Sequence, residues 1–129
     1  MGKISEAQAI LRAIGMPERQ QTPVCALSLL ALAHIRPDDD WCQASNEWIR
    51  IHDIIQFVNL NYEVDYAENS RETFRKQAMH HFRNAALIED NGKATNSPNY
   101  RYRLTQETFR LLHTFHTALW EKSVKELTD

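Results

Sequence analysis

The chain has 129 residues, about the size of one domain, and a net charge of −2 at pH 7. Hydrophobic residues make up 43% and charged residues 25%, which excludes a disordered or fibrous chain. The apolar run from Cys25 to Ala33 is too short to span a bilayer and the N-terminus lacks the apolar core of a signal peptide, so we expect a cytoplasmic protein without membrane contacts. Two cysteines are too few for a disulfide framework, and only three glycines favour helices over a turn-rich β-sandwich.

Basic charge is concentrated in the middle of the chain. Residues 1–68 hold five Lys/Arg and ten Asp/Glu, a net of −5, whereas residues 69–103 hold seven and three, a net of +4. Residues 104–129 hold three and four, a net of −1. A basic segment beside an acidic one is typical of a DNA reader with one docking face, although a solvated helix can carry the same charges without a partner.

Apolar spacing predicts two helices in the first third of the chain. In residues 4–14 apolar side chains recur every three or four positions, as in an amphipathic helix. Thr22 and Pro23 form an N-cap and a first-turn proline, and the run after them is apolar on nearly every face, so we expect this helix in the core. Residues 36–46 are predicted to form an ordered loop that Trp41 anchors.

Two further helices form a predicted helix-turn-helix over about residues 51–86. The first is expected from Ile51 to about Asn61. The second begins at Asn69, which we expect to form a capping box with Glu72. At 100° per residue, its inward stripe is predicted to be Phe74, Ala78, Phe82 and Ala85. Its outward face is predicted to carry Thr73, Lys76, His80 and Arg83, with Arg75 and Gln77 at the margins.

A hairpin and a closing helix are predicted to follow. Asn, Gly, Ser and Pro lie between two β-prone runs, residues 86–89 and 100–104, so we expect a wing over about 86–104. Thr105 is expected to cap a last helix over about 105–122, with an inward stripe of Phe109, Leu112, Phe115, His116 and Leu119. This order of elements predicts a mainly α, winged helix-turn-helix fold, a single domain over 1–129 with about five helices and a β-hairpin wing.

Several motifs resemble the N-terminal region of BsuBI/PstI-type type II restriction endonucleases. Residues 69–87 read NSRETFRKQAMHHFRNAAL, which is similar to the family pattern NTRETFRRQTMHQFxxAGL. Further matches are WCQASN at 41–46, NSP at 96–98 and LLHTFHTALWE at 111–121, so the resemblance covers nearly the whole chain. A closely similar region occurs in related adenine-specific DNA methyltransferases. The resemblance implies a helix-turn-helix domain that precedes a separate catalytic domain, which would carry any Mg²⁺.

The chain departs from the family pattern in a few places. The glycine of the turn that leads into the third helix is absent, because the sequence there is Trp48, Ile49, Arg50 and Ile51. Ser70 replaces the usual Thr, Lys76 the usual Arg and His81 the usual Gln. We expect such changes to alter which base is read more than which phosphates are contacted.

The sequence disfavours both a nuclease site and a zinc site. Residues 37–40 read PDDD, which superficially resembles the start of a PD-(D/E)xK metal site, but no lysine has an acidic residue two positions before it. We therefore expect a solvated turn there and no catalytic residue in this chain. The six histidines lack the paired spacing and nearby thiols of a zinc site, so no metal ligand is predicted.

The leading hypothesis is a target-recognition domain that binds double-stranded DNA. Side chains expected to neutralise phosphates are Lys76, Arg83, Lys93, Arg101 and Arg75. Side chains expected to read base edges near the helix N-terminus are Ser70, Arg71, Thr73, Gln77 and His80. Asn96, in the predicted wing, completes the set of candidate DNA-binding residues. The alternative is a winged-helix module that docks a catalytic subunit through its acidic face, and a catalytic domain or a second copy is a possible further partner.

Overall fold

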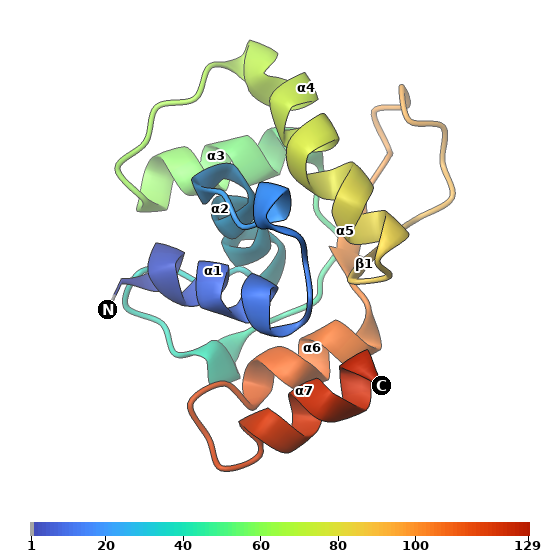
Figure 1. Ribbon diagram of the computed structural model, residues 1–129. Coiled ribbons are helices and arrows are strands. Elements are labelled where there is room, and N and C mark those ends of the chain that lie inside the picture. Colours follow the sequence, from blue (N-terminus) through green and yellow to red (C-terminus); the bar gives the residue numbers. More distant parts are fainter. Residues whose placement is uncertain (1) are drawn as a thin grey trace.

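Helix α2 (Pro23–Ala33) lies at the centre of the computed structural model, which describes residues 2–129 (Figure 1). Every residue from Cys25 to Ala33 is buried, as the nearly continuous apolar run predicted. The hydroxyl of Ser28 donates to the Val24 carbonyl at 2.8 Å, so its burial leaves no unpaired polar group. The predicted start is confirmed, because the Thr22 side chain accepts from the Cys25 N–H and Pro23 is the first helical residue.

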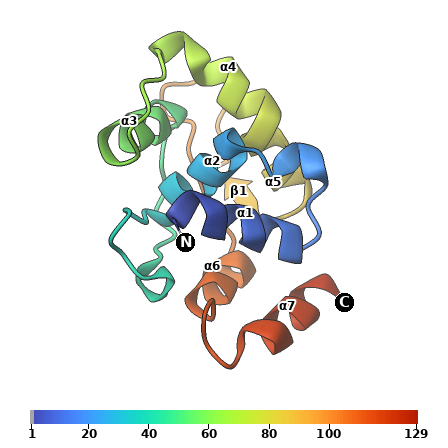
Figure 2. The ribbon, with the colours of Figure 1, turned by 60° about the vertical axis from the view of Figure 1, so that its left-hand side comes forward.

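Other elements surround α2 (Figures 1 and 2). Helices α1 (Lys3–Ala13) and α3 (Ile51–Asn61) pack against it, and both agree with the predicted ranges to within about one residue. Trp41 anchors the loop after α2 as predicted, since it is buried and its indole N–H donates to Glu6 at 3.1 Å. Short 3₁₀ turns occur at Glu18–Gln20, Trp41–Gln43 and Glu68–Ser70.

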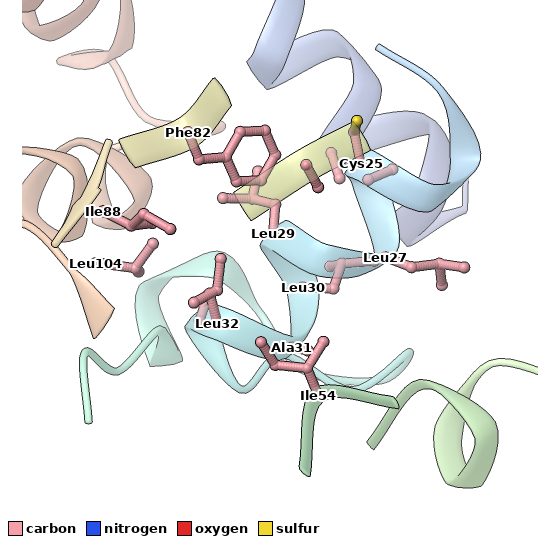
Figure 3. Packing of buried hydrophobic residues seen from close by; sticks show 14 of the residues in the cluster. Cys25, Leu27, Leu29, Leu30, Ala31, Leu32, Ile54, Phe82, Ile88 and Leu104 are labelled. Carbon is pink, nitrogen blue, oxygen red and sulfur yellow. The ribbon is translucent and has the colours of Figure 1, made fainter. Parts of the chain in front are cut away.

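A continuous helix over residues 71–84 contains a π-helical turn. Its parts are α4 (Arg71–Phe74), the π turn (Arg75–Met79) and α5 (His80–Asn84). Phe74, Ala78 and Phe82 are buried as predicted, and in Figure 3 the Phe82 ring points toward Leu29 of α2. The thiol of Cys25 donates to the Gln77 carbonyl in the π turn at 3.0 Å, which joins this helix to α2.

Three details of this helix differ from the prediction. The capping box at Asn69 is wrong, because the preceding 3₁₀ turn runs directly into the helix and Glu72 binds Arg75 instead. Met79 is buried beside Ala78, although it was not in the predicted inward stripe. The π turn has more residues per turn than the constant step of 100° assumes, which rotates Met79 toward the core. Ala85 is exposed because the helix already ends at Asn84.

The wing is a two-stranded antiparallel sheet. Strand β1 (Ile88–Asp90) pairs with β2 (Tyr102–Leu104), with Ile88 opposite Leu104. Both strands are shorter than the predicted runs. Ile88 and Leu104 are buried in the core, and Figure 3 shows both side chains. Ile49, just before α3, forms a further bridge to Tyr102, with N–O distances of 2.8 and 2.9 Å in the two directions.

The predicted last helix over 105–122 is wrong, because it is divided into α6 (Gln106–His113) and α7 (Trp120–Thr128). The chain turns at His116, which adopts a left-handed backbone with φ 66°, and α7 packs back against α6 (Figure 2). His116 and Leu119 are therefore exposed instead of inward. Thr105 stands at the cap position, but its hydroxyl bonds to the Ala86 carbonyl and not to a helix N–H.

The predicted fold class is confirmed. The architecture is mainly helical, with a helix-turn-helix formed by α3 and the helix over 71–84, followed by the hairpin wing. Within residues 2–129 there is one more helix than expected, because the last predicted helix is divided into α6 and α7. Among residues 2–129, no helix has the length and apolar character needed to cross a membrane.

Candidate nucleic-acid interface

The outward face of the helix over 71–84 and the loop of the wing lie next to each other (Figure 1). All eleven side chains predicted to bind DNA are exposed or half-buried. The exposed ones are Arg71, Lys76, Gln77, His80, Arg83, Lys93 and Asn96, and the half-buried ones are Ser70, Thr73, Arg75 and Arg101. The structure therefore places these residues on the surfaces of the wing and of the second helix of the helix-turn-helix (residues 70–84, called the recognition helix below), where a ligand has access to them.

A cleft of about 620 Å³ separates the wing loop from the two helices of the helix-turn-helix. Four basic side chains line it, namely Arg50, His52, Arg71 and Arg75. The wing contributes neutral hydrogen-bonding groups, among them Asn96, Ser97 and the two tyrosines Tyr100 and Tyr102. Burial, together with the neighbouring Tyr100, raises the pKa of Tyr102 to about 12, so this hydroxyl keeps its proton. This lining of basic and neutral hydrogen-bonding groups suits an anionic ligand.

Sequence reasoning missed Arg50 and His52. Counting charge by segment placed Arg50 in the acidic part of the chain, although the fold brings it to the basic cleft. The bridge between Ile49 and Tyr102 explains this position, because it ties the start of α3 to the wing. One signal could have found them: Arg50 directly precedes the first helix of the predicted helix-turn-helix and His52 lies in its first turn, and in such motifs the first helix crosses the DNA backbone.

Each guanidinium group in the cleft is paired with a carboxylate three residues away in sequence, and the first pair is Arg50 with Asp53 at 3.0 Å. Arg71 donates from Nε and Nη2 to Glu68 at 2.8 and 2.6 Å, and His52 Nδ1 lies 2.7 Å from the same Glu68 oxygen. Hydrogen bonds from His52 and Arg71 lower the pKa of Glu68, which keeps it ionised. Arg75 Nη1 donates to Glu72 at 2.6 Å, while its Nε is buried without a hydrogen-bond partner among residues 2–129.

Arg83 joins the recognition helix to the wing. Its Nη1 lies 3.0 Å from Asp90 Oδ2 and 3.0 Å from the Tyr100 hydroxyl, which itself donates to Asp90 at 3.1 Å. The backbone N–H of Gly92 and, after it, Arg83 and Tyr100 lower the pKa of Asp90. The two elements are thus held at a fixed separation by a closed set of polar contacts.

Lys76, Gln77 and His80 differ from the arginines. Within the described part of the chain, the side chains of Lys76 and Gln77 make no hydrogen bond or ion pair, and the His80 ring has one hydrogen-bond partner, the Asn84 amide at 3.2 Å. All three are exposed on one helix. They are consequently able to bind a ligand without first breaking an ion pair.

The acidic turn at residues 37–40 does not fit a magnesium site. Asp39 binds the Arg36 backbone N–H at 2.9 Å and the Arg36 side chain at 3.2 Å, and Asp40 caps the short turn that begins at Trp41. Asp39 and Asp40 therefore stabilise turns, and residues 2–129 contain no group of three or more His, Cys, Asp or Glu arranged to hold a metal ion. His113 bonds through Nε2 to the Ala44 carbonyl at 2.8 Å, a structural contact between α6 and the loop.

Comparison with known proteins identifies close relatives. The family model described as the BsuBI/PstI restriction endonuclease HTH domain matches residues 1–129. The type II restriction enzyme BsuBI of Bacillus subtilis is 37% identical over 123 residues, 92% of this chain and 39% of that protein. The type II restriction enzyme AplI of Arthrospira platensis is 27% identical over 120 residues, 88% of this chain and 36% of that protein.

A solved structure, that of the SdaI restriction endonuclease, has the same fold. It superposes with a TM-score of 0.91 at 26% sequence identity, over 97% of this chain and 40% of that chain. The chain spans about two fifths of the length of these relatives.

Proposed function

This chain belongs to the family of BsuBI/PstI restriction endonuclease HTH domains, and we propose that it is the part of a type II restriction endonuclease that recognises double-stranded DNA. The observation that carries the proposal is the cleft between the helix-turn-helix and the wing, where four basic side chains from the start of α3 and from the helix over 71–84 converge. B-DNA carries one negative charge about every 1.7 Å of its axis, so a basic cleft beside an exposed helix suits its backbone.

The proposal divides the contacts into two kinds. Lys76 and the wing residues Lys93 and Arg101 neutralise phosphates, which gives affinity that depends on salt. Gln77 and Arg71 read base edges in the major groove, where glutamine pairs with adenine and arginine with guanine. Arg83 is placed by its pairing with Asp90 to hold the wing, in addition to the phosphate contact predicted for it.

Cleavage belongs, in this proposal, to the portion of the relatives that this chain does not span. The relatives named as type II restriction enzymes are longer than this chain by a factor of about two and a half, which leaves room for a catalytic domain and its Mg²⁺. Asp39 and Asp40 are engaged in turn contacts, and no step of catalysis is assigned to residues 38–40.

Selection of bound oligonucleotides from a random duplex pool tests the proposal. We expect enrichment of one short sequence after several rounds, since a recognition helix with exposed Gln77 and Arg71 distinguishes bases. A pool that is retained but never enriched would limit the chain to non-specific phosphate binding. A pool that is not retained at 50 mM salt would reject DNA binding and leave docking of a catalytic subunit as the function of this domain.

A further inference from the structure

The side chains His52, Glu68 and Arg71 form a chain of contacts that links the two helices of the helix-turn-helix. His52 is in the first turn of α3, Glu68 is in the 3₁₀ turn before the recognition helix, and Arg71 is the first residue of α4. An ionised carboxylate only accepts hydrogen bonds, so His52 Nδ1 donates to Glu68 over the 2.7 Å contact. One carboxylate oxygen therefore receives donors from both sides.

This arrangement fixes one edge of the Arg71 guanidinium and leaves the other available. Nε and Nη2 both donate to Glu68 Oε1, and no residue within 2–129 accepts from Nη1. Arginine reads guanine with two parallel N–H groups directed at O6 and N7. The N–H groups of Nη1 and the second N–H of Nη2 can supply such a pair while Glu68 stays bound.

We infer that Glu68, held by His52, is a positioning residue that orients Arg71 for base reading. The inference rests on the proposed DNA-binding function. A free arginine loses rotamer freedom when it docks on a base, and a side chain already held in one geometry loses less, which favours the correct base. The side chains of Glu68 and Arg71 are 50% and 48% exposed, so the pair contributes little to folding on its own, and its role lies in binding.

A rival interpretation assigns Glu68 the opposite effect. A carboxylate on the DNA-facing side could only repel phosphates, in which case its removal would tighten binding to every duplex. The contact with His52 favours the positioning role, because a carboxylate that served only for repulsion would need no second donor to fix it. The two interpretations predict changes of opposite sign.

The test uses the parent chain and four variants, Arg71→Ala, Glu68→Ala, Glu68→Gln and Arg71→Ala with Glu68→Ala. Binding is measured by fluorescence anisotropy on the selected duplex, on duplexes with single base-pair changes, and on a scrambled duplex. Glu126→Ala, an exposed glutamate on α7, is the matched control. Thermal melts verify that each variant is folded.

Arg71→Ala should lose discrimination at one base pair by about 5- to 150-fold. Glu68→Ala should lose discrimination by at least about threefold at the same base pair and at no other. Glu68→Gln should keep more discrimination, because its amide oxygen still accepts from Arg71. The double variant should discriminate as Arg71→Ala alone does. The inference would be overturned if the Glu68→Ala variant bound all duplexes more tightly, or if it discriminated between base pairs as the parent does. If Arg71→Ala discriminates as the parent does, the inference is also overturned, although the proposed DNA binding is not. If the parent chain binds no duplex, the proposed function itself is refuted.

Discussion

Replacing Phe82 by alanine removes a ring that is 0% exposed and points toward Leu29 at the contact between the recognition helix and α2 (Figure 3). The variant loses the transfer free energy of the ring and leaves a cavity, because neighbouring side chains relax only in part. Together these effects cost about 3–5 kcal/mol in free energy of unfolding. For a urea slope of about 1–3 kcal/mol/M, the unfolding midpoint should fall by roughly 1 M or more.

Leu60→Ala is the matched control for this experiment, since Leu60 is also a large apolar residue on a helix but is 84% exposed. Its free energy of unfolding should remain within about 0.5 kcal/mol of the parent. Urea unfolding followed by far-UV circular dichroism measures both variants. A loss below about 1 kcal/mol for Phe82→Ala would refute the packing of the recognition helix, and with it the assignment of its outward face.

Three further outcomes are expected. Gln77→Ala should cost roughly 1–3 kcal/mol on the selected duplex and leave binding to scrambled duplex almost unchanged, as measured by anisotropy; equal losses on both would place Gln77 on phosphate instead. Because the folded-state pKa of Asp90 is lowered, the stability that it contributes is complete above about pH 4 and is lost as the pH falls further, so the parent should lose more stability than Asp90→Asn between pH 5 and pH 3 in urea melts; equal losses would contradict the role of Asp90 in the wing. Thr22→Ala should lower the free energy of unfolding by about 1 kcal/mol, since the Cys25 N–H loses its acceptor, and no change would show that the cap is not needed.

Much of the local structure was predictable because it depends on neighbours in sequence. The ranges of α1 and α3 follow from apolar periodicity, and the start of α2 follows from a threonine and a proline in adjacent positions. The wing was predicted by the cluster of turn residues between two β-prone runs. In each case the deciding interaction joins residues that are close in sequence.

The errors arose where distant contacts decide the geometry. Apolar spacing continues through His116, but the chain turns there because Phe115 packs edge-on against Trp41 and Trp120, with ring centroids 5.8 and 5.0 Å apart. Nothing local in the sequence reveals these contacts. The π turn at Arg75–Met79 likewise changes the angular position of the following side chains, and a constant step of 100° per residue does not predict this change.

The candidate interface was predictable as a surface but not as a set of interactions. Helical phasing gave the exposed positions of Lys76 and His80, whereas the pairing of Arg83 with Asp90 depends on where the wing folds back. The approach of Arg50 to the cleft depends on the bridge between Ile49 and Tyr102, residues far apart in sequence.

The salt dependence of DNA binding by Lys76→Ala tests most directly the claim that the recognition helix and wing bind DNA. Anisotropy on a fixed duplex at several salt concentrations gives the slope of log K against log[salt] for the parent chain, for Lys76→Ala and for the control Lys122→Ala, which changes an exposed lysine on α7. The account predicts a strongly negative slope for the parent, a slope smaller in magnitude by about one unit for Lys76→Ala, and an unchanged slope for Lys122→Ala. Identical slopes for the parent and Lys76→Ala, or equal reductions in both variants, would contradict it.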